Sequence, residues 1–273
     1  MIRFFISIFL CAFVVFPHFS VAEDSMQETS EAEISVPFEQ FRAQDWEPRI
    51  LLKYDPEAQQ DNKSVLLPPF APHSDEQMNE IEYIRTITKA RTDKQEAQFK
   101  AMQDDPVRQL LNILGLDGEE LIETRLLLFS GLEALNKKIW EEKWRYQRLR
   151  PTQFDPFIKS LKPLPGSASY PAEKASQAKM AAFILTDLFP DHDYIWMGWA
   201  EYVGKQYELA GLQFPSDTRA GYDLAERYYI DLKSDIDYQN LILNSNIELL
   251  NKAPNIKKLT KEIGEITPPK SFP

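Results

Sequence analysis

The residues best placed to do chemistry lie in the segment KWRYQRLRP, residues 143–151. Lys143 and Arg150 stand seven positions apart, about two helical turns, so a continuous helix would project both from one face near its C-terminal end. Two fixed cations suit an oxyanion. Taken alone, the pattern is more typical of a basic helix end that complements the helix dipole.

Two later segments place polar residues at the expected starts of helices. In SYPAEKAS, residues 169–176, Pro171 precedes a first turn that holds Ala172, Glu173 and Lys174, and a helix N-terminus favours anions. In AGLQFPSDTRAG, residues 210–221, a glycine turn precedes Asp217 in the first turn of another helix. Each segment, taken alone, is typical of an ordinary capped helix start.

Together, the order and spacing of the three segments resemble the signature of the phosphatidic acid phosphatase type 2 superfamily, and within it the bacterial class A non-specific acid phosphatases. The resemblance extends from about Leu67 to Asp231. It implies an all-α helical bundle of the acid phosphatase/vanadium haloperoxidase type. It also implies a periplasmic phosphomonoester hydrolase whose chemistry uses no metal.

In the first two motifs, the resemblance implies that Lys143 and Arg150 hold phosphoryl oxygens. The family's second motif is Pro-Ser-Gly-His or Pro-Ala-Glu-His, and its histidine protonates the leaving group. Here Ala172 and Glu173 are followed by Lys174 at the histidine position. An ordinary lysine ammonium is a much weaker acid than a histidine imidazolium, so Lys174 could serve as the acid only if its pKa fell by several units. The expected pocket uses Lys174 as a third cation for phosphate.

In the third motif, the family has Ser-Arg, five residues, a histidine that attacks phosphorus, three residues, and an aspartate that orients the histidine. Gln206 and Tyr207 stand in place of Ser-Arg, Gln213 in place of the histidine, and only Asp217 is retained. An amide has no basic nitrogen and cannot form a phosphoenzyme. Asp217 would be placed to orient an imidazole at position 213, if one were there. No residue is therefore assigned as catalytic.

The expected function is a secreted acid-phosphatase-like protein that is catalytically impaired and retains an anion pocket of Lys143, Arg150 and Lys174. Its ligand would be phosphate, vanadate or a phosphomonoester. Two alternatives stay open: an active phosphatase with an unorthodox nucleophile or water, and a helical interaction protein without a ligand. No cofactor and no metal are expected, because the family chemistry is metal-free and the sequence has no His or Cys cluster. Any protein partner is unknown.

The elements that must position these residues are helices. Apolar residues recur at helical spacing, no alternating strand pattern bounded by tight turns appears, and the expected fold is all-α. The helices are expected at residues 74–100, 105–114, 117–150, 172–189, 193–210, 216–232 (capped by Ser216) and 238–251.

Composition narrows the classes of function further. The chain of 273 residues has 42 acidic and 31 basic side chains and a net charge of -11, which argues against a sequence-independent nucleic-acid binder. It contains 9 glycines and no glycine-rich phosphate loop. Its 3 histidines, at positions 18, 73 and 192, do not fill the catalytic gap by their place in the sequence.

The N-terminus reads as a signal peptide, residues 1–22, with Arg3 before an apolar run and Ser20-Val21-Ala22 at its end. We expect cleavage after Ala22 and secretion to the periplasm, and no later stretch approaches a membrane span. Residues 23–66 would form an acidic lead-in and an extended wrapping segment, 67–251 the helical domain, and 252–273 a polar tail. The single cysteine, Cys11, excludes a disulfide framework after cleavage.

Overall fold

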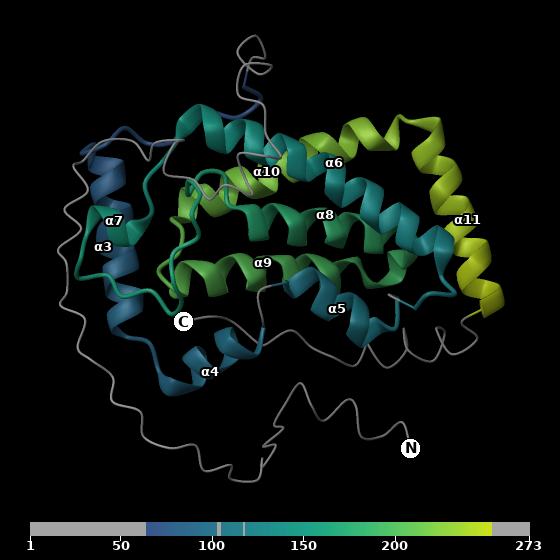
Figure 1. The fold of residues 1–273 in the computed structure, drawn as a ribbon, viewed down its shortest axis with the longest axis horizontal. Coiled ribbons are helices and arrows are strands. Elements are labelled where there is room, and N and C mark those ends of the chain that lie inside the picture. The colour runs from purple at the N-terminus through teal and green to yellow at the C-terminus, as the bar shows by residue number, and fades with distance from the viewer. Residues whose placement is uncertain (1–63, 103–104, 117, 253–273) are drawn as a thin grey trace. The chain divides into compact units, whose positions relative to one another are not determined.

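The computed structural model describes residues 64–102, 105–116 and 118–252, and every regular element within these ranges is a helix (Figure 1). The expected all-α class is thus confirmed for this part of the chain. All described residues belong to one compact unit, Phe38–Pro273. The expected signal peptide, almost all of the lead-in and wrapping segment, and the tail beyond Lys252 lie outside the described residues.

The helices follow one another along the chain with short connections between them. They are α3 (Asp75–Lys89), α4 (Asp93–Ala101), α5 (Pro106–Leu114), α6 (Ile122–Tyr146), α7 (Pro151–Phe154), α8 (Glu173–Leu188), the short 3₁₀ helix η4 (Pro190–His192), α9 (Asp193–Leu209), α10 (Pro215–Lys233) and α11 (Ile236–Lys252).

Two expected helices are shorter than the sequence pattern indicated. The helix expected at 74–100 is divided into α3 and α4, because Thr92 starts a new helix: its side chain accepts a hydrogen bond from the Gln95 amide, and the Gln95 side chain accepts one from the Thr92 amide. The helix expected at 117–150 begins at Ile122 and ends at Tyr146. Gln147 ends it in the left-handed conformation, with φ of 45°.

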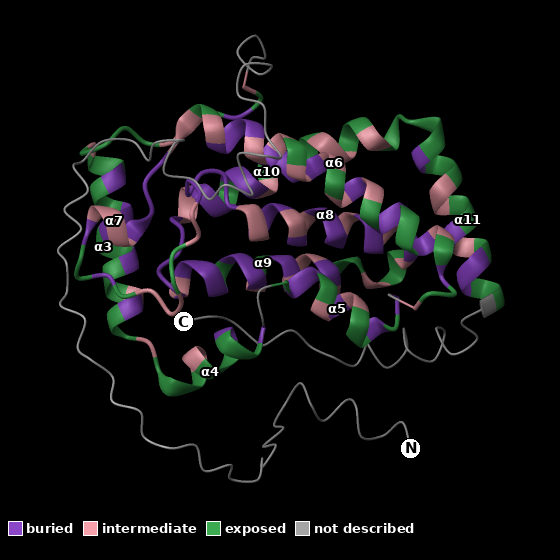
Figure 2. Ribbon diagram, viewed as in Figure 1, coloured by how far each residue is buried: buried purple, intermediate pink, exposed green. Residues whose placement is uncertain are grey.

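The helix α8 lies at the centre of the bundle, between α9 on one side and α6 and α10 on the other (Figure 1). Its buried face is built largely from alanines, and Ala175, Ala178, Ala181 and Ala182 are all fully buried. Figure 2 shows buried segments along much of α8 and α9. Small side chains let neighbouring helices approach closely, so α8 can contact three partners at once.

The approach of α10 to α8 is closest at Gly221. A Cβ at this position would lie 2.7 Å from the Ala172 carbonyl oxygen and 2.8 Å from Ser176 Oγ. Both atoms belong to the first turn of α8 or its cap. The absence of a side chain at Gly221 therefore brings the first turns of α10 directly against the start of α8.

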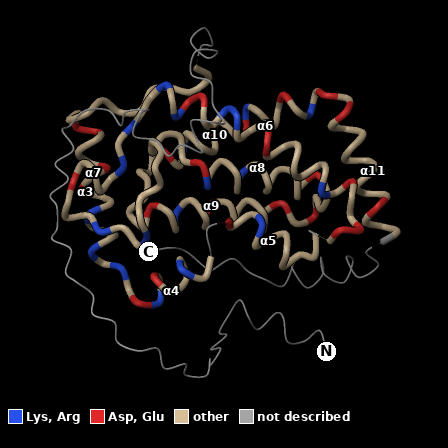
Figure 3. The backbone as a smooth tube through the Cα atoms, in the orientation of Figure 1, with Lys and Arg blue, Asp and Glu red and all other residues tan. Residues whose placement is uncertain are grey.

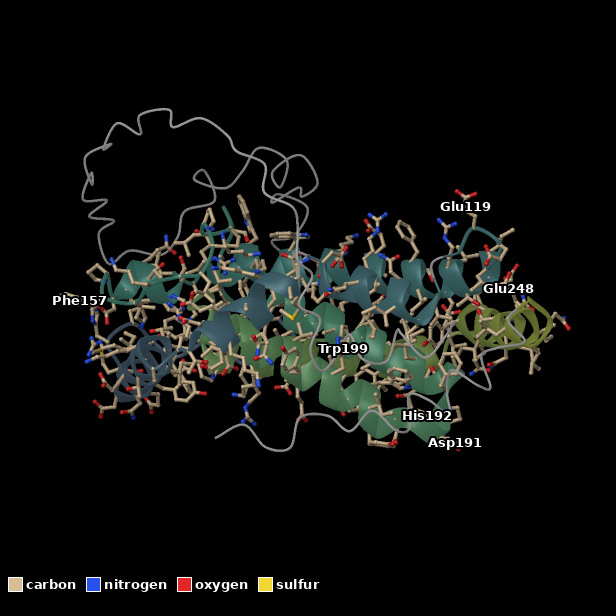
Figure 4. The ribbon with its side chains drawn as sticks, turned by 90° about the horizontal axis from the view of Figure 1, so that it is seen from below. Glu119, Phe157, Asp191, His192, Trp199 and Glu248 are labelled. Atoms are coloured by element: carbon tan, nitrogen blue, oxygen red, sulfur yellow. The ribbon has the colours of Figure 1, made fainter. Side chains whose placement is uncertain are left out.

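At the opposite end of the bundle, α11 caps α6. Leu121, the N-cap of α6, provides no side-chain hydrogen bond. The Glu248 carboxylate of α11 instead accepts hydrogen bonds from the Thr124 amide at 2.9 Å and the Thr124 hydroxyl at 3.0 Å. Figure 4 shows Glu248 at the end of the molecule away from Phe157. This contact satisfies a buried amide that α6 cannot satisfy itself.

We expect Glu248→Ala to lower the free energy of unfolding by about 1–2 kcal/mol, the usual effect of losing an N-cap acceptor. Glu133→Ala, which removes an exposed carboxylate from the same helix α6, is the matched control and should change stability by less than about 0.5 kcal/mol. Urea denaturation followed by circular dichroism measures both. Equal losses in the two variants would show that the contact does not stabilise α6.

Candidate functional site

The three sequence motifs meet at one end of the bundle, where α6 and α9 end and α8 and α10 begin (Figure 1). Lys143 Nζ of the first motif donates a hydrogen bond to the Ala168 carbonyl oxygen at 2.5 Å, just before the second motif. The Ala172 amide of the second motif donates to the Asp217 carbonyl oxygen of the third at 3.0 Å. The expected convergence of the three segments is present.

Lys143 lies in the last turn of α6 and is 1% exposed. Among the described residues, its ammonium has one hydrogen-bond acceptor, the Ala168 carbonyl, and it lies 5.8 Å from the centre of the Trp140 ring. An ammonium has three N–H groups, so two of them have no acceptor from this part of the chain. A buried cation in this state carries a large desolvation cost.

The surroundings of Lys143 also disfavour its charged form. Burial lowers the pKa of the Lys143 ammonium to about 7, and the charges of Arg150 and Lys174 act in the same direction. Glu173 and Asp217 oppose this shift by attracting the charged form. Lys143 therefore changes charge near neutral pH.

Arg150 is also buried, but it does not extend from the same helix as Lys143. The expectation that both project from one helix face is wrong, because α6 ends at Tyr146 and Arg150 stands at the start of α7. Its guanidinium donates to Ser167 O at 3.0 Å, Leu212 O at 2.7 Å and Ala168 O at 3.3 Å. Lys143 and Arg150 share the Ala168 carbonyl oxygen, so the two cations are neighbours.

The pKa of Arg150 is lowered to about 10 by burial, against the attraction of Asp217 and Glu173. The guanidinium is therefore still charged at neutral pH. Its contacts with backbone oxygens of the 151–170 loop and of residue 212 hold the loop before α8 against the turn before α10.

Lys174 and Glu173 lie in the first turn of α8 and are partly exposed. The Lys174 ammonium donates to Gln177 Oε1 at 3.0 Å and lies 3.6 Å from Glu173 Oε1. The Lys174 and Glu173 side chains are 23% and 27% exposed. Both side chains act electrostatically on Lys143, and Glu173 also acts on Arg150. The Ala172 amide is not free for a ligand, because it binds Asp217 O.

Asp217 is fully buried, and both of its carboxylate oxygens are in use. Oδ1 accepts from the Arg148 guanidinium at 2.5 Å. Oδ2 accepts from Ser169 Oγ at 2.5 Å and from the Phe214 amide at 2.8 Å. The expectation that Asp217 stands ready to orient a side chain at position 213 therefore needs correction. The retained aspartate instead caps α10 and pairs with an arginine.

Gln213 and Tyr207, two further positions of the third segment, make structural contacts. The Gln213 amide donates to Thr218 Oγ1 at 2.8 Å. The Tyr207 ring packs edge-on against Phe99, with ring centres 5.4 Å apart, and lies 5.3 Å from Lys162 Nζ. Gln206 is 2% exposed, and its Oε1 has no hydrogen-bond partner among the described residues.

Arg148 is the residue that sequence reasoning missed. Its guanidinium donates to Glu80 Oε2 at 2.8 Å and Gln77 Oε1 in α3, and to Ser216 Oγ at 2.7 Å in α10, besides Asp217. The attraction of Asp217 and Glu80 outweighs burial and raises the pKa of Arg148. Arg148 lies in the first motif, two residues before Arg150, but its partners lie 68 to 71 positions away in the sequence. No local pattern therefore indicated its role.

Ser216 takes part in this network rather than capping α10 as expected. The N-cap of α10 is Phe214, and Ser216 lies in the first turn. Its amide donates to Glu80 Oε1 at 2.6 Å, and its hydroxyl donates to Glu80 Oε2 at 2.8 Å. The start of α10 is therefore satisfied by a carboxylate from α3.

The described histidines lie outside the site. Figure 4 shows His192 beside Asp191 at the edge of the molecule, well separated from Phe157 in the loop that follows α7. His73 is exposed in the segment before α3. Figure 3 shows basic and acidic segments beside one another at the end of the bundle that contains α3, α4 and α7. The cations of the candidate site are lysine and arginine side chains.

No protein-family model matches the chain, and no curated protein matches its sequence. Within the described residues, no group of three or more His, Cys, Asp or Glu side chains could hold a metal ion. None of the described helices combines the length and apolar character needed to cross a membrane. The comparisons therefore assign the chain to no family, and the resemblance to acid phosphatases consists of the motif residues alone.

We expect Arg148→Met to lower the free energy of unfolding by about 3–5 kcal/mol, because it leaves the Asp217 and Glu80 carboxylates buried without their cation. Arg125→Met, an exposed arginine on α6, is the matched control and should cost less than about 0.5 kcal/mol. Chemical denaturation measures both. A loss below 1 kcal/mol for Arg148→Met would contradict the role assigned to this ion cluster.

The low pKa of Lys143 predicts a pH dependence of stability. In the unfolded chain its pKa returns to about 10.4, so between pH 7 and 10 the unfolded state binds more protons than the folded state. Stability therefore rises with pH in this window, and the burial cost is fully present below pH 7. The free energy of unfolding of the natural protein, compared with that of Lys143→Met, should therefore rise by up to about 1.4 kcal/mol per pH unit above pH 7.

Urea denaturation at pH 6, 7, 8 and 9 tests this prediction. The exposed Lys137 of α6 provides the matched control, because Lys137→Met should follow the natural protein at every pH. If the natural protein and Lys143→Met differ by the same amount throughout, Lys143 keeps its proton and the assigned pKa shift is wrong.

Proposed function

We propose that this protein is a secreted, periplasmic acid-phosphatase-like protein that binds phosphate or a related oxyanion and has little or no phosphatase activity. The anion pocket is formed by Lys143, Arg150 and Lys174. Export rests on the apolar run that ends at Ala22, in a part of the chain outside the described residues. The membership in the phosphatidic acid phosphatase type 2 superfamily rests on the first motif and the frames of the other two.

The observation that carries the proposal is the buried Lys143 ammonium with one acceptor among the described residues. Buried polar groups in folded proteins nearly always have hydrogen-bond partners. A tetrahedral oxyanion next to Lys143 and Arg150 would supply the missing oxygens and would offset the repulsion between the two cations. Lys174, at the exposed edge, would make the first contact with an anion arriving from solvent.

The lack of catalysis is supported by the side chains at the family's reactive positions. Gln213 supplies an amide and Asp217 is held by Arg148 and Ser169. Neither arrangement provides a nucleophile with an adjacent base. An active enzyme would need another group to attack phosphorus, and this is the second candidate. A helical protein without ligand is the third, favoured if Lys143 and Arg150 serve only to hold the 151–170 loop.

We expect phosphate and vanadate to bind the natural protein at pH 6, where Lys143 is charged. Lys143→Met should weaken binding at least tenfold, whereas Lys137→Met, on the same helix, should leave it unchanged. Isothermal titration calorimetry measures the affinities. Hydrolysis of an aryl phosphate by the natural protein should be no faster than by the Lys143→Ala variant.

Two results would contradict the proposal. Turnover near ~10 s⁻¹, a typical enzyme value, that is lost in Lys143→Ala but kept in Gln213→Ala would identify an active phosphatase with another nucleophile. Absence of phosphate and vanadate binding at millimolar concentration would favour the helical protein without ligand.

A further inference from the structure

Glu173 places a negative charge beside the proposed anion pocket, whose other charged side chains are cations. It is the first residue of α8, and its carboxylate accepts a hydrogen bond from Gln177 Nε2 at 3.4 Å and lies 3.6 Å from Lys174 Nζ. No hydrogen bond joins it to Lys143 or Arg150 among the described contacts. Its charge nevertheless raises the pKa of both. By its measured distance, the Glu173 carboxylate stands beside Lys174, one of the three cations of the proposed pocket.

The charges of the seven side chains that interact around Lys143, Arg148 and Arg150 almost cancel. Arg148 is shared by two carboxylates, Asp217 and Glu80, so that cluster is negative overall. Glu173 offsets one of the remaining cations. With Lys143 protonated, a single positive charge is left over among four cations and three carboxylates. These are Lys143, Arg148, Arg150 and Lys174 on one side and Glu80, Glu173 and Asp217 on the other.

We propose that Glu173 makes the pocket selective for singly charged tetrahedral oxyanions, such as phosphodiesters and singly ionised phosphate, over doubly charged ones. One negative charge neutralises this group of side chains, and a second would lie near the partly exposed Glu173 carboxylate beside Lys174, whose like charge opposes it. This inference rests on the anion pocket of the proposed function and specifies its ligand class.

The test compares two ions whose charge does not change between pH 5 and 9, dimethyl phosphate with one charge and sulfate with two. At pH 6 the natural protein should bind dimethyl phosphate more tightly than sulfate. Glu173→Gln keeps the shape of the side chain and removes its charge, so it should raise the affinity for sulfate at least tenfold and that for dimethyl phosphate less than threefold. Glu133→Gln, an exposed glutamate on α6, should change neither.

A second measurement follows from the charges that face Lys143, which are Arg150, Glu173, Lys174 and Asp217. Removal of the Glu173 charge lowers the pKa of Lys143, because an attraction for the charged form is lost. Binding of dimethyl phosphate should therefore fall off at a lower pH in Glu173→Gln than in the natural protein. A merely structural role for Glu173 would not shift this pH.

The outcomes separate this inference from the proposed function. If Lys143→Met abolishes binding of both ions but Glu173→Gln leaves their affinity ratio unchanged, the pocket exists and the selectivity assigned to Glu173 is wrong. If neither ion binds the natural protein at millimolar concentration, the pocket itself is absent and both proposals fail.

Discussion

The guanidinium of Arg148 is the point on which the arrangement of the candidate site depends. It joins α3, through Gln77 and Glu80, to the first turn of α10, through Ser216 and Asp217. Breaking a buried ion cluster of this kind lowers the free energy of unfolding strongly, because the charges that remain are shielded from water and have lost their counter-ion. The loop that carries Arg148 is therefore held against two helices that lie far away in the sequence, and Arg150 follows two residues later in the same segment.

The two other buried cations, Lys143 and Arg150, bind backbone carbonyl oxygens, whereas Arg148 binds carboxylates. Arg150 binds the oxygens of residues 167, 168 and 212, and Lys143 binds that of residue 168. Carbonyl dipoles orient a cation but do not neutralise it. The result is a region where hydrogen bonds hold the chain in place and yet leave the cations without a bonded counter-ion. Glu173 acts electrostatically on both cations and is not shared with Arg148.

The all-α class and the bounds of most helices could be predicted from the sequence, because periodicity and capping residues act locally. Pro106, Gly115 and Phe189 end or begin helices close to the expected positions. The break between α3 and α4 was missed, since the signal of Thr92 lay within a favourable helical pattern. In the site, the convergence of the motifs was predictable from their resemblance. The role of Arg148 was not, because no local pattern indicates which of several neighbouring arginines turns inward to meet carboxylates about 70 positions away.

The engagement of both Asp217 carboxylate oxygens has a consequence for any redesign of this site. A histidine arising at position 213 would find its orienting aspartate already engaged by Arg148, Ser169 and the Phe214 amide. Releasing Asp217 would first require the loss of contacts that hold α10 to α3 and to the loop before α8. A variant in which Asp217 is released would lose these contacts and would be less stable. A single substitution at position 213 would therefore not give a histidine that Asp217 can orient, because the Asp217 carboxylate already serves to hold the start of α10 in place.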